Sequence, residues 1–478
     1  MNYRLMLRTL GRTLHVEALC LLLPLVVCVL YGEDPRPFLY TIGLLAGLGL
    51  ALVRLRCRED FFQREGFVVV GLIWITLSLF GALPFWFSGE FGSFVDCLFE
   101  IVSAVTTTGA SILTDIESHS RGILFWRSFS SWIGGMGVLI FTLAFLPKVG
   151  GRAQVLVQAE STGPVSSKLV PKTAQSSKIL YLIYIGMTLA ELGALLLAGM
   201  PLYDAATTTF ATVCTGGFSV MNASMAAYGL PACEIIVIVF MLLCSLNFAV
   251  FFLILTGRGR QVLGSDELRC FLGVVAVATL LVFLAVLPSY DSAGRAFLDS
   301  LFQVSSIIST SGFATANYDL WPTLARIVLV LVMFVGGCAG STAGGLKCSR
   351  VLLLVRCAWR SLSRVLHPRA VKVVKLDGKA VDEDTLSTLS AFVTLFFLTL
   401  GGTCLVVSLD GFSPTTTVSA SLACLSNIGP GLEMVGPAGN FAAFSTLSKL
   451  VLTLAMLVGR LEIFPILILL HPATWRRT

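Results

Sequence analysis

Long runs of apolar residues alternate with short polar connections along most of this chain. Runs such as Leu182–Leu197, Ile235–Leu255 and Leu447–Leu457 have the length of a helix and few charges. Runs of this kind predict membrane-spanning helices, whereas a β-barrel would show short segments of alternating polarity. We therefore expect an all-α polytopic membrane protein embedded in a lipid bilayer.

Two helices are predicted first, over residues 9–31 and 38–53, with an outer turn at Glu33–Pro37. Three arginines precede the first apolar run, but no small-residue cleavage site follows it. This pattern favours a retained first span over a removed signal peptide.

A longer pattern then recurs four times: a span, a short helix, a polar stretch and a second span. In the first unit these segments are 67–88, 96–105, 106–111 and 122–146. The segments of the later units are 178–199, 204–213, 214–219 and 232–256, then 268–288, 299–308, 309–314 and 323–359, then 386–409, 416–425, 426–431 and 446–470. The predicted organisation is an N-terminal helical pair (1–65) and four pore repeats (66–150, 151–257, 258–384 and 385–478) around one pore with pseudo-fourfold symmetry.

The repeats share a register. Each polar stretch contains one aligned glycine, and thirteen residues before it lies an aspartate or a threonine: Asp96 before Gly109, Asp204 before Gly217, Asp299 before Gly312 and Thr416 before Gly429. These residue types favour helix N-caps, so they are predicted to begin the short helices. A helix-capping role alone would explain why an aspartate or a threonine occurs at each of these positions. It would not explain why each lies the same distance before its glycine, and this shared distance indicates an internal repeat.

The repeated unit suits a cation. A short helix that runs inward from the outer face directs its partially negative C-terminal end at the membrane centre. Non-helical backbone survives at that depth only where it lines a watery path or is buried in protein. Glycine permits dihedral angles that turn successive carbonyl groups toward an axis, where they can replace an ion's hydration shell. The stretches contain no carboxylate, which argues against a filter for divalent cations.

Composition and charge support the membrane assignment and add its orientation. Hydrophobic residues make up 56% of the chain and charged residues only 13%. Most basic residues lie in alternate connections, which the positive-inside rule places in the cytoplasm together with both termini. These connections are Arg4–Arg12, Arg54–Arg64, Lys148–Lys178, Arg258–Arg269, Lys347–Lys379 and Arg476–Arg477. The net charge of +6 therefore reflects topology, and we expect no nucleic-acid partner.

Chemistry of other kinds is not indicated. The thirteen cysteines are scattered, mostly through apolar runs, and the four histidines lie far apart. This pattern is typical of buried thiols that pack as small hydrophobic groups. No metal site, nucleophile elbow or cofactor motif is recognisable, so we do not expect an enzyme.

Several motifs resemble one known family. They are the four polar stretches together with Trp126–Gly137, Glu160–Pro164 followed by Lys168–Pro171, Gly336–Lys347 and Gly459–Glu462. Over nearly its whole length the chain resembles the Trk-type potassium uptake proteins, whose superfamily includes Ktr subunits and plant and fungal potassium transporters. The first helical pair makes it similar to the Trk membrane subunit rather than to the shorter Ktr subunit.

The resemblance implies potassium uptake across the bacterial inner membrane. It implies that backbone carbonyls at and just before the aligned glycines hold K⁺, namely those of Thr107, Thr108, Gly109, Thr215, Gly216, Gly217, Thr310, Ser311, Gly312, Asn427, Ile428 and Gly429. Some plant relatives with serine at the position of Gly109 favour sodium, so this glycine favours potassium. The fourth stretch departs from the pattern at Ile428 and Pro430, and we expect a less symmetric ring there.

Small residues interrupt the second span of the third unit. They are Gly336, Gly337, Gly340, Ser341, Thr342, Gly344 and Gly345, and Lys347 follows them. Close helix packing through small residues is one interpretation. A phosphate-binding loop is disfavoured, because Cys348 follows Lys347 where that motif has serine or threonine. In relatives this break forms an intramembrane loop that obstructs permeation beneath the filter, and our hypothesis is that it is the gate.

Arg460 lies within an apolar span, where a charge is costly and therefore a functional candidate. The resemblance places it near the pore below the filter, as an electrostatic barrier to cations. Alternatively, it forms an ion pair with Glu191, Glu100 or Glu433. Arg127, near the outer end of its span, is expected to be a structural or interfacial residue rather than an ion ligand.

Regulation is expected to involve another chain. The basic segment Arg350–Asp384 contains no nucleotide-binding motif. The resemblance implies a cytosolic ring of nucleotide-binding regulatory subunits beneath a homodimer of the membrane protein. A sodium- or proton-coupled potassium symporter remains the alternative function, with Glu191 and the neighbourhood of Arg460 and Glu462 as its candidate groups.

Overall fold

Helices dominate the computed structural model, which describes residues 3–55, 63–137, 173–259, 262, 264–369 and 372–475. Within these ranges, strands are confined to one antiparallel hairpin of β1 (Lys375–Leu376) and β2 (Lys379–Ala380). Six described helices are long and apolar enough to cross a membrane, and one bent helix pair could add a seventh. The prediction of an all-α polytopic membrane protein is confirmed.

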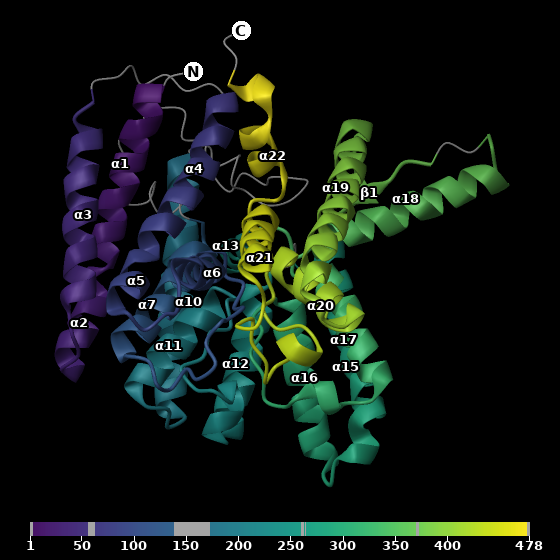
Figure 1. Ribbon diagram of the computed structural model, residues 1–478. Coiled ribbons are helices and arrows are strands. Elements are labelled where there is room, and N and C mark those ends of the chain that lie inside the picture. The colour runs from purple at the N-terminus through teal and green to yellow at the C-terminus, as the bar shows by residue number, and fades with distance from the viewer. Residues whose placement is uncertain are drawn as a thin grey trace.

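The N-terminal helices form the predicted pair. α1 (Tyr3–Cys20) continues into α2 (Leu22–Tyr31), and α3 (Arg36–Val53) returns beside α1 (Figure 1). Two glycines permit this close packing, because a Cβ on Gly11 would lie 2.7 Å from the Leu52 side chain and one on Gly49 would lie 2.8 Å from the His15 ring. The start of α1 and the end of the last helix lie at the same end of the bundle (Figure 1).

The remaining helices follow the predicted order of segments. The first unit contains α4 (Gln63–Gly81), α5 (Leu83–Ser88), α6 (Phe94–Val105) and α7 (Arg121–Gly135). The second contains α10 (Thr173–Leu197), α11 (Leu202–Val213), η1 (Ser224–Tyr228), α12 (Pro231–Cys244) and α13 (Phe248–Leu255). The third contains α15 (Asp266–Val286), η2 (Leu287–Ser289), α16 (Ala293–Ile308), η3 (Tyr318–Leu320), α17 (Thr323–Val335) and α18 (Cys348–Leu366). The fourth contains α19 (Glu383–Val407), η4 (Ser408–Asp410), α20 (Pro414–Leu425), η5 (Glu433–Val435), α21 (Thr446–Arg460) and α22 (Phe464–Leu470), followed by η6 (Pro472–Thr474).

Contacts between the units follow one rule. The helix after each polar stretch packs on the short helix of the next unit: α7 on α11, α12 on α16, α17 on α20 and α21 on α6. The last of these contacts joins the fourth unit to the first, so the series closes on itself. The predicted boundary at residues 150 and 151 and the motifs Glu160–Pro164 and Lys168–Pro171 lie outside the described residues.

The predicted helix starts were wrong. Ser93 caps α6 by accepting from the Asp96 N–H at 3.1 Å, and Ser413 caps α20 in the same way for the Thr416 N–H. Asp96 and Thr416 are therefore third residues of their helices, as is Asp204 in α11. An acid is also favoured at that position, since it lies near the free N–H groups of the first turn. Asp299 lies further inside α16, which begins at Ala293.

Two spans predicted to be continuous are broken. α12 and α13 meet at an angle of 93° around residues 245–247. α21 and α22 are separated by a turn in which Glu462 and Ile463 both have positive φ. The interruption predicted in the third unit is confirmed, because α17 ends at Val335 and α18 begins at Cys348.

Candidate functional site

The four polar stretches begin with the same backbone turn. The second residue of each stretch is left-handed, with φ between 53° and 58° at Thr107, Thr215, Thr310 and Asn427. In the first stretch the Thr107 N–H donates to the Ala104 carbonyl and the Thr108 N–H to the Ser103 carbonyl, both at 2.8 Å. The other three stretches repeat both hydrogen bonds. This helix ending normally uses glycine, and a residue with a Cβ costs roughly 1–2 kcal/mol there.

The aligned glycines converge on one another. Each has a positive φ, between 62° and 96°, so the sign of φ alternates along each stretch. A Cβ on each glycine would overlap the carbonyl oxygen of the residue before the glycine in the next unit. The pairs are Gly109 with Gly216, Gly217 with Ser311, Gly312 with Ile428 and Gly429 with Thr108. We call this closed series the glycine ring, and it brings together all four predicted stretches.

Side chains of the stretches are tied to one another. The Asn427 Nδ2 donates to Thr108 Oγ1 and to the Met456 carbonyl, both at 2.9 Å, which links the fourth stretch to the first. Thr106 and Thr108 share a hydrogen bond of 2.7 Å between their hydroxyls. Although Ile428 and Pro430 depart from the other units, the fourth stretch keeps the positive φ angles of the other three. The fourth stretch therefore differs from the other three in sequence but keeps their backbone conformation.

A buried ion pair supports the C-terminal end of the first stretch. Arg127 Nε lies 2.8 Å from Glu100 Oε1, and both side chains are at most 3% exposed. Glu100 also accepts from the Ser111 hydroxyl and the Ile112 N–H, both at 2.9 Å. Arg127 reaches the second unit, where its guanidinium lies 4.0 Å above the Phe218 ring. These contacts agree with the expected structural role of Arg127.

The 336–347 loop lies against the ends of the short helices. The Gly344 N–H donates to Thr310 Oγ1 at 2.7 Å, and the Thr342 hydroxyl donates to the Cys244 carbonyl at 3.2 Å and more weakly to that of Val213. A Cβ on Gly344 would overlap the Ser426 carbonyl oxygen. The loop therefore contacts the second, third and fourth units where their polar stretches begin.

The loop is itself tightly folded. Gly336, Gly340, Gly345 and Lys347 all have positive φ, between 69° and 76°. The Lys347 ammonium is buried and donates to the Ala343 carbonyl. The break is therefore an ordered loop with its own hydrogen bonds, which the alternative of simple close helix packing does not describe.

Two neighbouring elements hold the loop in place. At the bend between α12 and α13, the Cys338 N–H donates to the Ser245 carbonyl at 2.8 Å and the Phe248 N–H donates to the Gly340 carbonyl at 3.1 Å. On α15, Glu267 Oε1 accepts from the N–H groups of Ala339 at 2.7 Å and Ser349 at 3.1 Å. Neither anchor was predicted from the sequence. Asn247, which caps α13, was the signal of a bend within its apolar run.

Arg460 binds carbonyl groups from two other units. Its Nη1 donates to Thr342 at 2.6 Å, and its Nη2 donates to Gly134 at 2.7 Å and Gly135 at 2.6 Å. The fourth unit thus holds both the 336–347 loop and the end of α7.

Three acids were considered as ion-pair partners for Arg460, and their own contacts and burial are as follows. Glu100 pairs with Arg127, and Glu433 accepts from the hydroxyls of Ser413 and Thr416. Glu191 is fully buried on α10. Nearby, Glu462 pairs with Arg350, whose guanidinium also lies 4.1 Å over the Phe392 ring.

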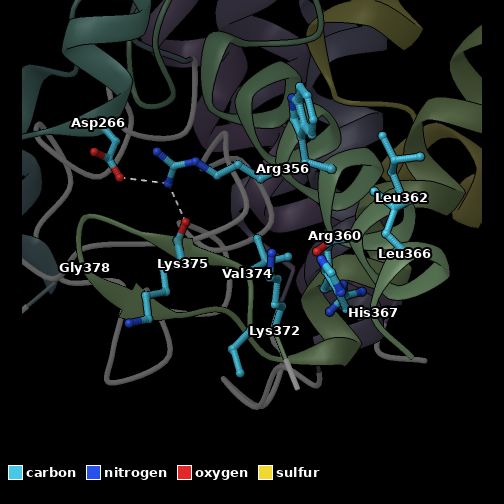
Figure 2. A pocket seen from close by; sticks show the side chains of 13 residues that line it. Asp266, Arg356, Arg360, Leu362, Leu366, His367, Lys372, Val374, Lys375 and Gly378 are labelled. Carbon is cyan, nitrogen blue, oxygen red and sulfur yellow. Dashed lines mark hydrogen bonds and ion pairs between the residues drawn. The ribbon is translucent and has the colours of Figure 1, made fainter. Parts of the chain in front are cut away.

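A separate cavity of about 770 Å³ lies between α18 and the β-hairpin (Figure 2). Its basic lining residues are Arg356, Arg360, His367, Lys372 and Lys375. Arg356 pairs with Asp266 at 2.8 Å, and Arg360 pairs with Glu383. The hydrogen bond to Glu383 raises the pKa of Arg360 above its ordinary value. No group of three or more His, Cys, Asp or Glu residues in the described ranges could hold a metal ion.

Comparisons with known proteins agree with this architecture. The family model described as TrkH, cation transport protein, matches residues 49–476. The chain is 36% identical to the Trk system potassium uptake protein TrkH of Salmonella typhimurium over the full length of both chains. It is 33% identical to the Trk system potassium uptake protein TrkG of Escherichia coli, covering 98% of this chain and 97% of that protein. The crystal structure of the potassium transporter TrkH from Vibrio parahaemolyticus superposes with a TM-score of 0.89 at 35% identity, with full coverage of both chains.

Proposed function

This chain belongs to the TrkH cation transport family, and we propose that it takes up K⁺ across the bacterial inner membrane through the glycine ring. It is thus a multi-pass member of a transporter family rather than an enzyme. The observation that carries the proposal is the closed series of glycine-to-carbonyl contacts among four polar stretches. Each pore repeat (66–150, 151–257, 258–384 and 385–478) contributes one quarter of that ring.

K⁺ is the proposed cargo because the ring offers neutral oxygens. The carbonyls of Thr107–Gly109, Thr215–Gly217, Thr310–Gly312 and Asn427–Gly429 are the proposed ligands. Alternating φ signs turn successive peptide groups to the same side, as a carbonyl-lined filter needs. Backbone oxygens without fixed charges favour a monovalent ion that gives up its hydration shell readily. The chain itself supplies no cofactor in this scheme.

The 336–347 loop is the proposed gate, and Arg460 the proposed electrostatic barrier. The loop contacts three short-helix ends, so the pathway inward from the ring must pass beside it. Opening requires the loop to leave Thr310 and the bend between α12 and α13. Arg460 holds the loop by the Thr342 carbonyl and adds a positive charge at the same depth.

Control is proposed to come from the cytosol. The relatives are named as parts of a Trk system, a name that implies partner subunits. We assign the basic cavity at α18 and the β-hairpin as the docking region for a ring of nucleotide-binding regulatory subunits beneath a homodimer. The shared position of α1 and α22 in Figure 1 agrees with two cytoplasmic termini.

Flux through liposomes tests the proposal. Purified protein is reconstituted, and uptake of K⁺, Rb⁺ and Na⁺ is measured with and without a gradient of Na⁺ or pH. We expect K⁺ and Rb⁺ to pass faster than Na⁺ and to follow their own electrochemical gradients. Uphill K⁺ accumulation driven by the second gradient would instead establish the coupled symporter. Equal passage of Na⁺ and K⁺ would refute the selectivity assigned to the ring.

A further inference from the structure

Two thiols meet where the proposed gate joins α15. Cys348 is the first residue of α18 and directly follows the 336–347 loop. Its Sγ lies 3.8 Å from the Glu267 carbonyl oxygen, one helical turn before Cys270 on α15. Cys270 therefore lies on the turn of α15 that Cys348 contacts, and the two thiols lie close to each other.

The pair combines an accessible thiol with a protected one. Both cysteines are free, and Cys348 is fully buried whereas Cys270 is partly exposed. Cys270 lies four residues after Asp266, which pairs with Arg356 at the rim of the basic cavity. A small reagent can therefore approach Cys270 near the N-terminal start of α15, while Cys348 is held beside it to react second.

The position of the pair links it to the loop. Glu267 Oε1 already binds the Ala339 and Ser349 N–H groups, so the loop and the start of α18 both rest on α15. These hydrogen bonds can open when the loop moves. A covalent bond between Cys270 and Cys348 could not open, and it would fix the C-terminal end of the loop to α15.

We propose that Cys270 and Cys348 form a reversible disulfide that locks the 336–347 loop in its present position and lowers K⁺ flux. The oxidant is a small-molecule disulfide. The Cys270 thiol loses its proton and attacks one sulfur of the reagent, which releases one thiol and leaves a mixed disulfide on Cys270. Cys348 then attacks Cys270 and releases the second thiol. The two cysteines lose two electrons and the reagent gains them with two protons. Disulfides of this kind in a reducing compartment are typically transient and regulatory.

The effect on flux rests on the proposed function of the loop, whereas formation of the bond does not. The full-length protein in liposomes is treated with oxidised glutathione and then with a reductant. Mass spectrometry of the digested protein detects the Cys270–Cys348 peptide, and K⁺ flux is measured on the same samples. Cys270→Ser and Cys348→Ser each remove the pair, and Cys357→Ser, a partly exposed cysteine further along α18, is the matched control.

We expect the linked peptide in the wild type and the Cys357→Ser variant, with K⁺ flux at least tenfold lower until reduction restores it. Both single-serine variants at the pair should show neither effect. Absence of the linked peptide, or a link from Cys270 to Cys338 instead, would overturn the proposal. A complete link with unchanged flux would overturn its regulatory part. Failure of the reduced protein to conduct K⁺ would count against the proposed function, and the linked peptide would still decide the chemistry.

Discussion

The Arg460 guanidinium lies 2.6 Å from the Thr342 carbonyl oxygen, so one charge at the end of α21 holds the middle of the 336–347 loop. The same side chain reaches the last two glycines of α7. Arg460 therefore places a positive charge and a set of anchoring hydrogen bonds at the same position. Separate variants are needed to distinguish the effect of the charge from the effect of the hydrogen bonds.

Arg460→Gln is expected to raise K⁺ flux roughly tenfold. A unit charge about 10 Å from the ion path costs a cation about 1.7 kcal/mol at an effective dielectric constant of about 20, which corresponds to a change in rate of roughly ten- to twentyfold. Flux per reconstituted protein in liposomes measures the effect. If the variant only lowers the yield of folded protein and leaves flux unchanged, the arginine is a structural strut.

Arg460→Lys separates charge from anchoring. Lysine keeps the charge but cannot reproduce the planar set of donors that binds three carbonyls. Flux close to wild type would assign the effect to charge. Flux as high as in Arg460→Gln would assign it to release of the loop.

Deletion of Gly340–Gly344 is expected to raise resting K⁺ flux. The deletion removes the hydrogen bond from Gly344 to Thr310 and the contact with Ser426 that hold the loop beside the glycine ring. Flux without any regulatory subunit is the measurement, and gel filtration confirms that the variant is folded. Unchanged resting flux in a folded variant would refute the gate.

Gly217→Ala is expected to abolish selective K⁺ flux. Its Cβ would overlap the Ser311 carbonyl oxygen, and its φ of 62° is unfavourable for alanine. Gly109→Ser should act more mildly and shift the preference from K⁺ toward Na⁺. Gly186→Ala on α10 is the control, because nothing lies within 4 Å of its added Cβ. Wild-type selectivity in Gly217→Ala would contradict the ring as the filter.

Arg127→Met is expected to destabilise the protein by about 3–5 kcal/mol, because it leaves the buried Glu100 carboxylate without its counter-ion. Thermal unfolding in detergent measures the loss. The exposed pair of Arg36 and Asp34 provides the control, and Arg36→Met should change stability by less than about 1 kcal/mol. Equal losses in the two variants would show that the buried pair has no special role.

The convergence of the four stretches was predictable from the spacing of their glycines. The reason is physical: Gly109 and its three equivalents occupy a backbone conformation that other residues rarely adopt, so the requirement is visible in the residue type. The small residues between Gly336 and Gly345 revealed the loop for the same reason.

Other features depend on tertiary contacts and leave a weaker signal. The bend at Ser245 lies in an apolar run, and its backbone carbonyl is occupied by the Cys338 N–H from another unit. Asp96 carried a correct helix-start signal but was assigned to the wrong position, because acids serve both as N-caps and as third residues. The partners of Arg460 are carbonyl groups, which every residue has, so no residue type could identify them.

One polypeptide encodes every quarter of the glycine ring. In an assembly of four identical subunits, each inherited substitution would appear four times at once. In this chain a substitution in one stretch changes one quarter of the ring, and the sequences of the other three quarters stay the same. The fourth stretch is an example, since Asn427 and Ile428 differ from the equivalent residues of the other stretches while the positive φ angles occur at the same positions. Under the proposed function, a substitution in one stretch would change one quarter of the filter and leave the other three quarters as they are.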